Sequence, residues 1–184
     1  MLGTLGFIYA HQGNYEKAIE CQKRNLRIAR TIQARREEGH FLGSLGEAYE
    51  SRKDYPNAIK HYEQSLTIAE ETQESLGQTI LLRNLGNIYS SLEEYAQAIN
   101  YYKQSLNIAR RIPDSWEAEK VILKLVKASC ALGKYDEAID YNHQHFVLVQ
   151  EREGERGEWE GAWGVRFLNC PKYCLTAKRN SLKL

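Results

Sequence analysis

The stretch LRNLGNIYSSLEEYAQAINYY, residues 82–102, contains the pattern that decides the fold. Its Leu85-Gly86 pair is followed by Tyr89 and, after a short polar interval, by Tyr95 and Ala98. The same spacing recurs 40 residues apart along the chain. A fixed period of this length predicts stacked copies of one supersecondary unit. The matching positions are Leu5, Gly6, Tyr9, Tyr15 and Ala18 in copy one, Leu45, Gly46, Tyr49, Tyr55 and Ala58 in copy two, and Tyr135 and Ala138 in copy four.

Each copy contains two helical patterns. In copy three, Leu82, Leu85, Gly86 and Tyr89 fall at positions i, i+3, i+4 and i+7, which is one face of a helix. No segment shows the apolar alternation of a strand. The pattern therefore predicts an all-α, right-handed α-solenoid of stacked helix–turn–helix units. The expected helices are 2–11, 15–34, 37–51, 55–72, 76–91, 95–111, 115–131 and 135–152, with a weaker ninth over 157–169.

Gly46 and Gly86 fall in the middle of expected helices, where glycine costs about 1 kcal/mol relative to alanine. Close approach of a partner helix would offset this cost, and Ala58 and Ala98 are the small residues expected opposite. Short connectors are indicated at 13–14 and 133–134. Two helix starts are also indicated: Pro56 suits a first helical turn, and Ser75 with Gln78 resembles a capping box.

These residues resemble the tetratricopeptide repeat, whose pattern is Leu-Gly-x-x-Tyr in the first helix and Ala-x3-aromatic in the second. Copies two and three match it fully, whereas copy one has Gln22 in place of the aromatic residue. The unit is longer than the common length of about 34 residues, and it is similar to the 40-residue repeats of the G-protein-signalling modulator (LGN/Pins) family and of bacterial signalling scaffolds. The expected units are 1–35, 36–74, 75–114 and 115–152.

The two ends depart from the pattern. The first helix of copy one is expected to be truncated and uncapped, so the chain is interpreted as a fragment of a longer array or as lacking an N-terminal neighbour. Residues 153–171 are interpreted as a degenerate fifth unit or cap, with a broken repeat as the alternative. The basic residues 172–184 are expected to be disordered.

Composition excludes several classes of protein. The formal net charge is +1, which gives no global electrostatic case for binding nucleic acid. No apolar run approaches the roughly 20 residues that span a bilayer, and no secretory signal is evident. The four cysteines are sparse, which favours free thiols in a reducing compartment and hence the cytoplasm. They are Cys21, Cys130, Cys170 and Cys174.

No constellation of residues indicates catalysis, a metal or a cofactor. Cys170 and Cys174 lack the second ligand pair of a zinc site. His143 and His145 point about 200° apart on a helix, so they cannot share one metal. The chain is therefore expected not to be an enzyme. Lys23, Arg24, Arg27 and Arg30 form a basic stripe, interpreted as a solvated outer face.

The family resemblance implies that the first helix of each unit lines a concave groove. The wall is then expected to be apolar in copy one, acidic in copy two, mixed in copy three and basic in copy four. Asn87 matches the asparagine that hydrogen-bonds the ligand backbone in the family, and Arg83 could grip a ligand carboxylate. Phe7, Glu47 and Lys127 stand where that asparagine would repeat. The candidate peptide-binding residues are Phe7, His11, Glu47, Glu50, Arg83, Asn87, Ser90, Lys120 and Lys127.

The expected function is a non-catalytic scaffold that binds an extended or helical segment of another protein in this groove. The alternative is a sensor or docking arm of a longer multidomain signalling enzyme, of which this chain would be a fragment. Self-association through the uncapped N-terminal face is a third interpretation. No nucleic acid, membrane or cofactor is expected to take part.

Overall fold

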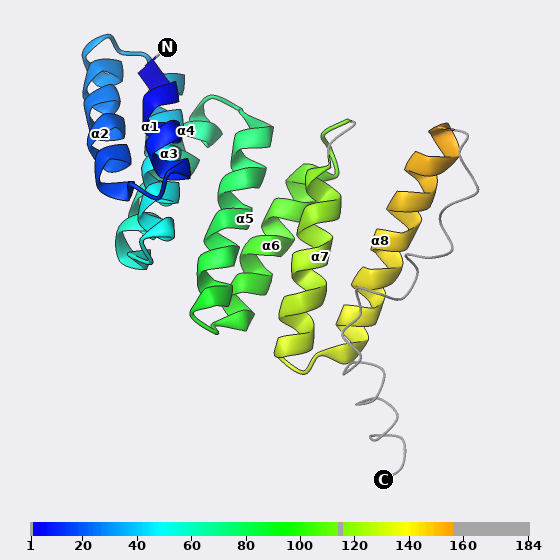
Figure 1. The fold of residues 1–184 in the computed structure, drawn as a ribbon. Helices are drawn as coiled ribbons and strands as arrows, with labels where there is room; N and C mark the ends of the chain where they lie inside the picture. The colour runs from blue at the N-terminus through cyan, green and yellow to red at the C-terminus, as the bar shows by residue number, and fades with distance from the viewer. Residues whose placement is uncertain (1, 114–115, 157–184) are drawn as a thin grey trace.

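The computed structural model describes residues 2–113 and 116–156, and within these ranges it contains eight α-helices and no strand (Figure 1). The expectation of an all-α repeat fold is therefore confirmed. The helices are α1 (Leu2–His11), α2 (Tyr15–Thr31), α3 (Arg35–Ser51), α4 (Tyr55–Glu71), α5 (Ser75–Ser91), α6 (Tyr95–Ala109), α7 (Glu117–Ala131) and α8 (Tyr135–Arg156).

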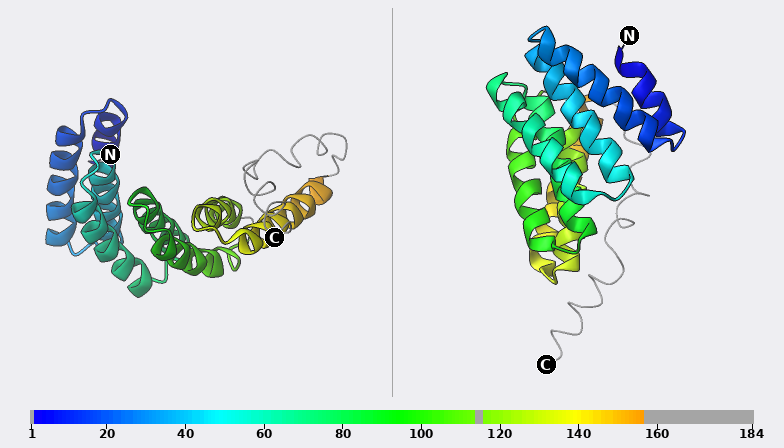
Figure 2. Two further views of the ribbon diagram at one scale, coloured as in Figure 1. Left: turned by 90° about the horizontal axis from the view of Figure 1, so that it is seen from below. Right: turned by 90° about the vertical axis from the view of Figure 1, so that its left-hand side faces the viewer.

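The helices stack in sequence order into a curved array. Each helix packs against the next one along the chain, and α1 also contacts α3 while α5 contacts α7. Seen from below, the array is an arc with α1, α3, α5 and α7 on its inner side and the even-numbered helices outside (Figure 2). The first helix of each pair therefore lines a concave wall, which is the arrangement expected of an α-solenoid.

The core follows the repeat. One buried cluster runs from α2 to α5, and a second comprises residues of α6 and α7 with Tyr141 and Leu148 of α8 packed against it. The periodic leucines Leu45 and Leu85 are fully buried, as is Leu125 in copy four. Burial of these equivalent side chains stabilises each helix pair through its neighbours.

The mid-helix glycines allow close approach of the second helix, as expected. A Cβ atom at Gly46 would lie 2.5 Å from the ring of Tyr62, and one at Gly86 would lie 2.5 Å from the ring of Tyr102. A tyrosine ring therefore occupies the space that each glycine leaves. That Ala58 and Ala98 also lie opposite these glycines stays a prediction.

The turns repeat every 20 residues. After most helices the backbone takes a left-handed conformation, at Gly13 and Gly133, where turns were expected, and also at four residues that are not glycine. Each of these turns closes with a hydrogen bond from the next amide to a carbonyl five residues earlier, as in Asp54 N–H to Tyr49 O. This is the Schellman motif, which satisfies carbonyl groups at the helix end. The four other residues are Gln33, Lys53, Gln73 and Glu93.

Some helix boundaries differ from expectation. Pro56 lies in the first turn of α4, as predicted. The capping box predicted at Ser75 is wrong, because Glu74 is the N-cap residue of α5 and its side chain makes no capping hydrogen bond. Gln78 instead donates to the backbone oxygen of Ala69 at 2.9 Å, which joins α5 to α4. Three helices expected to end at residues 34, 72 and 111 end at 31, 71 and 109, and α8 continues to Arg156.

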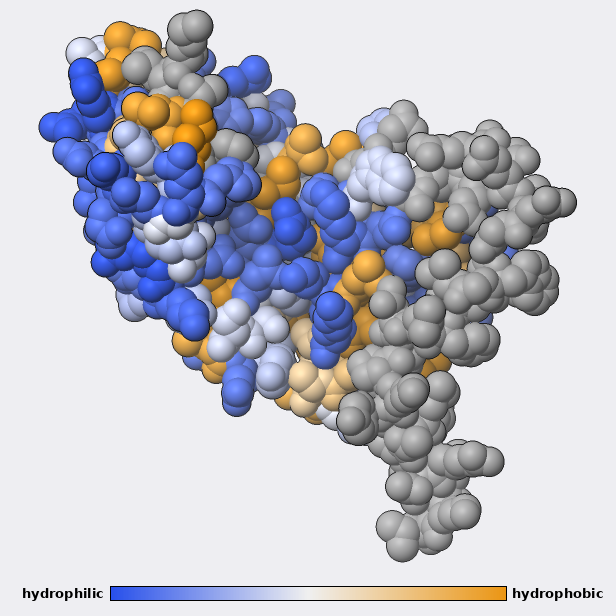
Figure 3. Space-filling view, viewed as in Figure 1, coloured by the Kyte–Doolittle hydropathy of each residue, from blue (hydrophilic) through white to orange (hydrophobic). Residues whose placement is uncertain are grey.

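The structure tests the interpretations of the two chain ends only in part. The ninth helix over 157–169 and the tail over 172–184 lie outside the described residues. At the other end, Leu5 and Ile8 of α1 are 50% and 49% exposed. An apolar area lies beside α1 at the upper left of the surface (Figure 3). Self-association through this face stays a prediction.

Candidate functional site

The inner wall of the array carries charges of both signs in separate places. We use "inner-wall charges" for Glu47 and Glu50 of α3, Arg83 of α5, and Lys124 and Lys127 of α7. Each of these side chains acts electrostatically on at least one other member of the group. Glu50 interacts with Glu47, Arg83 and Lys124, and Lys124 also interacts with Lys127. The three inner helices therefore bring residues up to 80 positions apart into one field.

The acidic end lies on α3. Partial burial, followed by the charge of the neighbouring carboxylate, raises the pKa of Glu47, and Arg83 opposes this shift. Burial likewise raises the pKa of Glu50, although its carboxylate accepts a hydrogen bond of 2.6 Å from the Tyr62 hydroxyl. Glu50 is partly buried, whereas Glu47 is exposed although its pKa is raised, and a positive ligand group would stabilise the charged forms of both.

Glu47→Gln should raise the Tm at neutral pH by about 2 °C, in the range expected for a change below 1 kcal/mol. The pKa of Glu47 is raised in the folded state, so folding favours the protonated form and ionisation of this group lowers stability as pH rises past the unfolded pKa. The advantage of the variant should therefore shrink as pH falls towards about 4. Thermal melts of both proteins across this pH range measure it.

Glu70→Gln provides the matched control, because Glu70 is an exposed carboxylate on the outer helix α4, away from the inner-wall charges (Figure 2). Its melting temperature should follow that of the native protein at every pH. A constant difference between Glu47→Gln and the native protein, independent of pH, would contradict the linkage.

Arg83 does not stand free on the wall. Its Nε atom lies 3.0 Å from Glu117 Oε2, and Lys120 Nζ lies 2.7 Å from Glu117 Oε1. Glu117 is buried, so it holds both cations and ties α5 to α7. The basic character expected at Lys120 is therefore partly neutralised, and a ligand carboxylate would have to compete with Glu117 for Arg83.

Asn87 is also partly engaged. The hydroxyl of Tyr102 donates to Asn87 Oδ1 at 3.0 Å, and Asn87 itself is half-buried on α5. Burial raises the pKa of Tyr102 to about 12, while its hydrogen bond to Ser90 opposes the shift. The hydroxyl therefore stays protonated at neutral pH and holds the amide in place. The Nδ2 group of Asn87 is then the half of the amide suited to donate to a ligand carbonyl.

The basic end lies on α7. Burial, the nearby charge of Lys127 and that of Arg83 lower the pKa of Lys124, whereas Glu50 raises it. Within the described residues, no ion pair joins Glu47, Lys124 or Lys127 to another side chain. These three charged side chains can therefore pair with oppositely charged groups of a ligand in the groove.

The structure brings together most of the predicted wall residues. Glu47, Glu50, Arg83 and Lys127 belong to one electrostatic group, and Asn87 and Ser90 lie beside Tyr102. His11 lines a pocket in copy one. The side chain of Phe7 lies outside the described residues, so the apolar character expected there stays a prediction.

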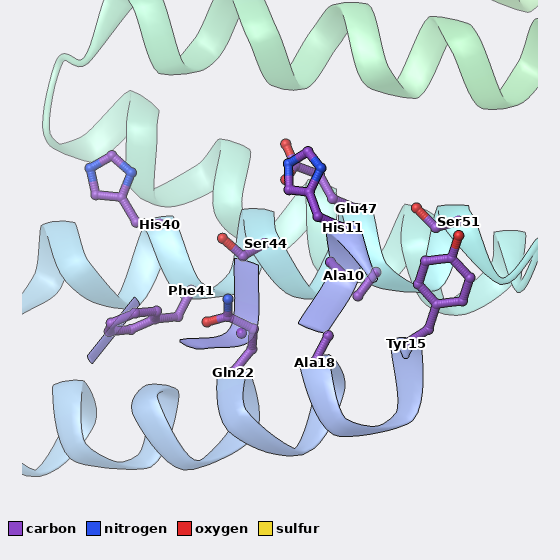
Figure 4. Close-up of a pocket in the computed structure, with 12 residues that line it drawn as sticks. Ala10, His11, Tyr15, Ala18, Gln22, His40, Phe41, Ser44, Glu47 and Ser51 are labelled. Carbon is purple, nitrogen blue, oxygen red and sulfur yellow. The ribbon is translucent and has the colours of Figure 1, made fainter. Parts of the chain in front are cut away.

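A pocket of about 460 Å³, here called the first-copy pocket, lies between α1, α2 and α3. Gln22 rises into it from α2, with Phe41 on one side and Ala18 on the other (Figure 4). His11 and Glu47 line another part of its wall (Figure 4). The remaining lining residues are Gly6, Ala10, Tyr15, His40, Ser44, Ala48 and Ser51.

Sequence reasoning missed Lys124, Tyr62 and Gln22 as site residues. Lys124 occupies the repeat position of Ser44 and Asn84, one residue away from the positions assigned to the wall. Tyr62 matched the repeat pattern and was expected only to pack. The departure at Gln22 was visible in the sequence, and it is the signal that would have pointed to the pocket.

The remaining residues that the sequence singled out are the basic stripe, the histidines of α8 and the cysteines. Arg30 of the basic stripe pairs with Glu38 at 2.8 Å, and His145 lies 3.6 Å from Glu119 on α7. Cys21 is a free thiol, but Cys130 is disulfide-bonded, so the expectation of free thiols is wrong at that position. Cys170 and Cys174 lie outside the described residues.

Metal sites and membrane-spanning helices are absent from the described part of the chain. No group of three or more His, Cys, Asp or Glu residues is placed to hold a metal ion. No helix in these ranges has both the length and the apolar character needed to cross a bilayer.

Several solved structures share this fold. BtubC (BKLC) from P. vanneervenii matches with a TM-score of 0.75 and 15% identity over 87% of this chain and 65% of its own. A putative kinesin light chain with TPR-like repeats from Podosopora anserina matches with a TM-score of 0.76 and 16% identity, covering 99% of this chain and 87% of its own. A Rap protein in complex with Competence and Sporulation Factor matches with a TM-score of 0.73 and 19% identity, covering 84% of this chain and 43% of its own. This chain thus spans less than two thirds of BtubC and less than half of the Rap protein.

Sequence comparison identifies the repeat itself. A comparison with curated proteins found no match. The family model described as the tetratricopeptide repeat matches residues 1–71 and 38–111, which together cover the first 111 residues. These ranges contain the three Leu-Gly-x-x-Tyr patterns and helices α1 to α6. The chain therefore belongs to the tetratricopeptide repeat family.

Proposed function

We propose that the concave wall binds an extended segment of another protein, with basic ligand residues over α3 and acidic ligand residues over α7. The observation that carries this proposal is the separation of Glu47 and Glu50 from Lys124 and Lys127 across the same wall. An arrangement of this kind orients a ligand of matching charge and rejects the reversed orientation.

Partial burial strengthens the argument. Carboxylates and ammonium groups that are poorly hydrated gain more from an opposite charge than fully exposed groups do. Burial shifts the pKa values of Glu47 and Lys124 towards their neutral forms, which indicates that neither charge is fully compensated inside the protein. A ligand with a cation beside Glu47 and an anion beside Lys124 would offset the free-energy cost of burying these charges.

Asn87 supplies the contact to the ligand backbone. Tyr102 holds its carbonyl oxygen, which leaves Nδ2 as a donor at the middle of the wall. Main-chain hydrogen bonds give affinity for an extended peptide largely independently of its sequence, and the flanking charges then give specificity. The Leu85-Gly86-Asn87 sequence, similar to that of the LGN/Pins family, supports this role. So does the Rap protein of the same fold that was solved with a bound factor.

Selection from a library of random peptides displayed on phage tests the proposal. The native protein should enrich peptides with basic residues near one end and acidic residues near the other. Glu47→Gln with Glu50→Gln should lose the basic preference only, and Lys124→Gln with Lys127→Gln should lose the acidic preference only. Each pair should weaken binding of an enriched peptide about tenfold, the size of one lost charge-assisted contact.

Matched controls lie on the outer helices. Glu63→Gln with Glu70→Gln, and separately Lys60→Gln, change exposed residues of α4 and should leave both preferences intact. Enrichment without any charge order, or equal losses in the outer-helix controls, would reject the wall as the binding surface.

A further inference from the structure

Gln22 leaves a polar atom without a partner inside the first-copy pocket. Its side chain is 5% exposed, and no hydrogen bond reaches its Oε1 atom from the described residues. Buried polar atoms are satisfied in nearly all native structures, so an exception in a residue that lines a pocket needs an explanation. The missing group must be a donor, because a carbonyl oxygen only accepts.

Comparison of the copies explains why the pocket occurs in copy one. Gln22 occupies the position of Tyr62 and Tyr102, whose rings fill the space against Gly46 and Gly86. Gln22 also approaches its glycine, since a Cβ atom at Gly6 would lie 2.6 Å from Gln22 Nε2. The amide is narrower than a phenol ring, however, and the first-copy pocket extends beyond it. The substitution therefore opens space and places an acceptor in it.

The walls of the pocket favour a cationic group. Gln22 and Glu47 supply acceptors, and the basic side chains described as lining the pocket are the imidazoles of His11 and His40, with no lysine or arginine among them. Glu47 is exposed to the groove, and the raised pKa of its carboxyl group means that a nearby positive charge would stabilise its charged form. Apolar surface from Phe41, Ala10 and Ala48 lies alongside, and such surface covers the methylene stem of a long basic side chain.

We infer that the first-copy pocket is a subsite for one basic side chain of the bound segment, with arginine preferred over lysine. The guanidinium donates to the carboxylate of Glu47 and, once the Gln22 amide turns towards the pocket, to Oε1, which is shielded from solvent in the unbound protein. Arginine fits better because its planar group presents several donors in fixed directions and stacks on aromatic rings such as Phe41. This inference rests on the proposed function, and it places the basic part of the ligand between α1 and α3.

The test uses an enriched peptide and two variants at position 22. Each arginine of the peptide is replaced in turn by citrulline, a neutral analogue of the same shape. At one position this change should weaken binding to the native protein about tenfold. Gln22→Tyr introduces the residue of copies two and three and fills the pocket. In the Gln22→Tyr variant, the same citrulline change should have almost no effect on the affinity for the peptide. Titration calorimetry measures this affinity.

Gln22→Met separates shape from chemistry, because it keeps a long side chain but removes the acceptor. Binding of the arginine peptide should fall, and the citrulline penalty should be smaller than in the native protein. Gln64→Met, at an exposed position on α4, is the matched control and should bind as the native protein does. Circular dichroism and melting curves confirm that each variant is folded before binding is compared.

The outcomes distinguish this inference from the proposal on which it rests. If charge-ordered peptides bind but no citrulline position couples to residue 22, the subsite is rejected and the charged wall stands. If the position that couples to residue 22 selects tryptophan or tyrosine, the assignment of a basic side chain is overturned. If the native protein enriches no peptide, both are rejected.

Discussion

Gly86→Ala is expected to destabilise the protein by about 1–3 kcal/mol, although alanine is the better helix former. The added Cβ atom would lie 2.5 Å from Cε1 and 2.7 Å from Cδ1 of Tyr102, which is inside van der Waals contact. Tyr102 is buried and bonded to Asn87, so its ring has little room to move away. The Tm should fall by roughly 2–4 °C per kcal/mol for a chain of this size.

Gly43→Ala is the matched control for this prediction. Gly43 also lies within a helix, α3, but a Cβ atom there would meet only Ser65 Oγ at 3.4 Å and Leu81 Cδ2 at 3.7 Å. Relief of the backbone entropy cost of glycine should then stabilise the protein by about 0.5–1 kcal/mol. Chemical denaturation of both variants measures the two opposite signs. Equal behaviour of the two would show that ring contact does not decide the choice of glycine at position 86.

Tyr62→Ala is expected to have the largest effect of the substitutions considered, a loss of about 3–5 kcal/mol. The side chain of Tyr62 is 0% exposed and belongs to the cluster that joins α2 to α5. Its removal leaves a cavity beside Gly46 and takes away the hydroxyl that donates to Glu50 at 2.6 Å. Denaturant titration followed by circular dichroism should show a lower midpoint and a weaker helical signal near physiological temperature.

Tyr62→Phe separates the ring from the hydroxyl. The ring still fills the space against Gly46, so the losses are the hydroxyl's hydrogen bonds with Glu50 and Asn84, at about 1–3 kcal/mol. The pKa of Glu50 should rise further, since this hydrogen bond favours its charged form. NMR titration of the carboxyl group checks the shift. A phenylalanine variant as unstable as the alanine variant would contradict the packing role of the ring.

The sequence was sufficient to predict the fold because the 40-residue period determines both the helical faces and the order in which they stack. Leu45 and Leu85 recur in one register, and each copy buries the same positions against its neighbours. Local spacing also predicted the turns at Gly13 and Gly133, where the residue type itself indicates a left-handed backbone. The turns at Lys53 and Glu93 had no such signal, because their conformation is imposed by the helices on either side.

The contacts of individual side chains were decided only by the tertiary structure. Arg83 meets Glu117 although 34 residues separate them, and the ring of Tyr102 lies over Gly86. Helical periodicity specifies which face a residue occupies, but the curvature of the stack sets which side chains come within bonding distance. For the same reason the sequence showed that Gln22 replaces an aromatic residue, whereas the pocket and the unsatisfied oxygen that result depend on how α1, α2 and α3 pack together.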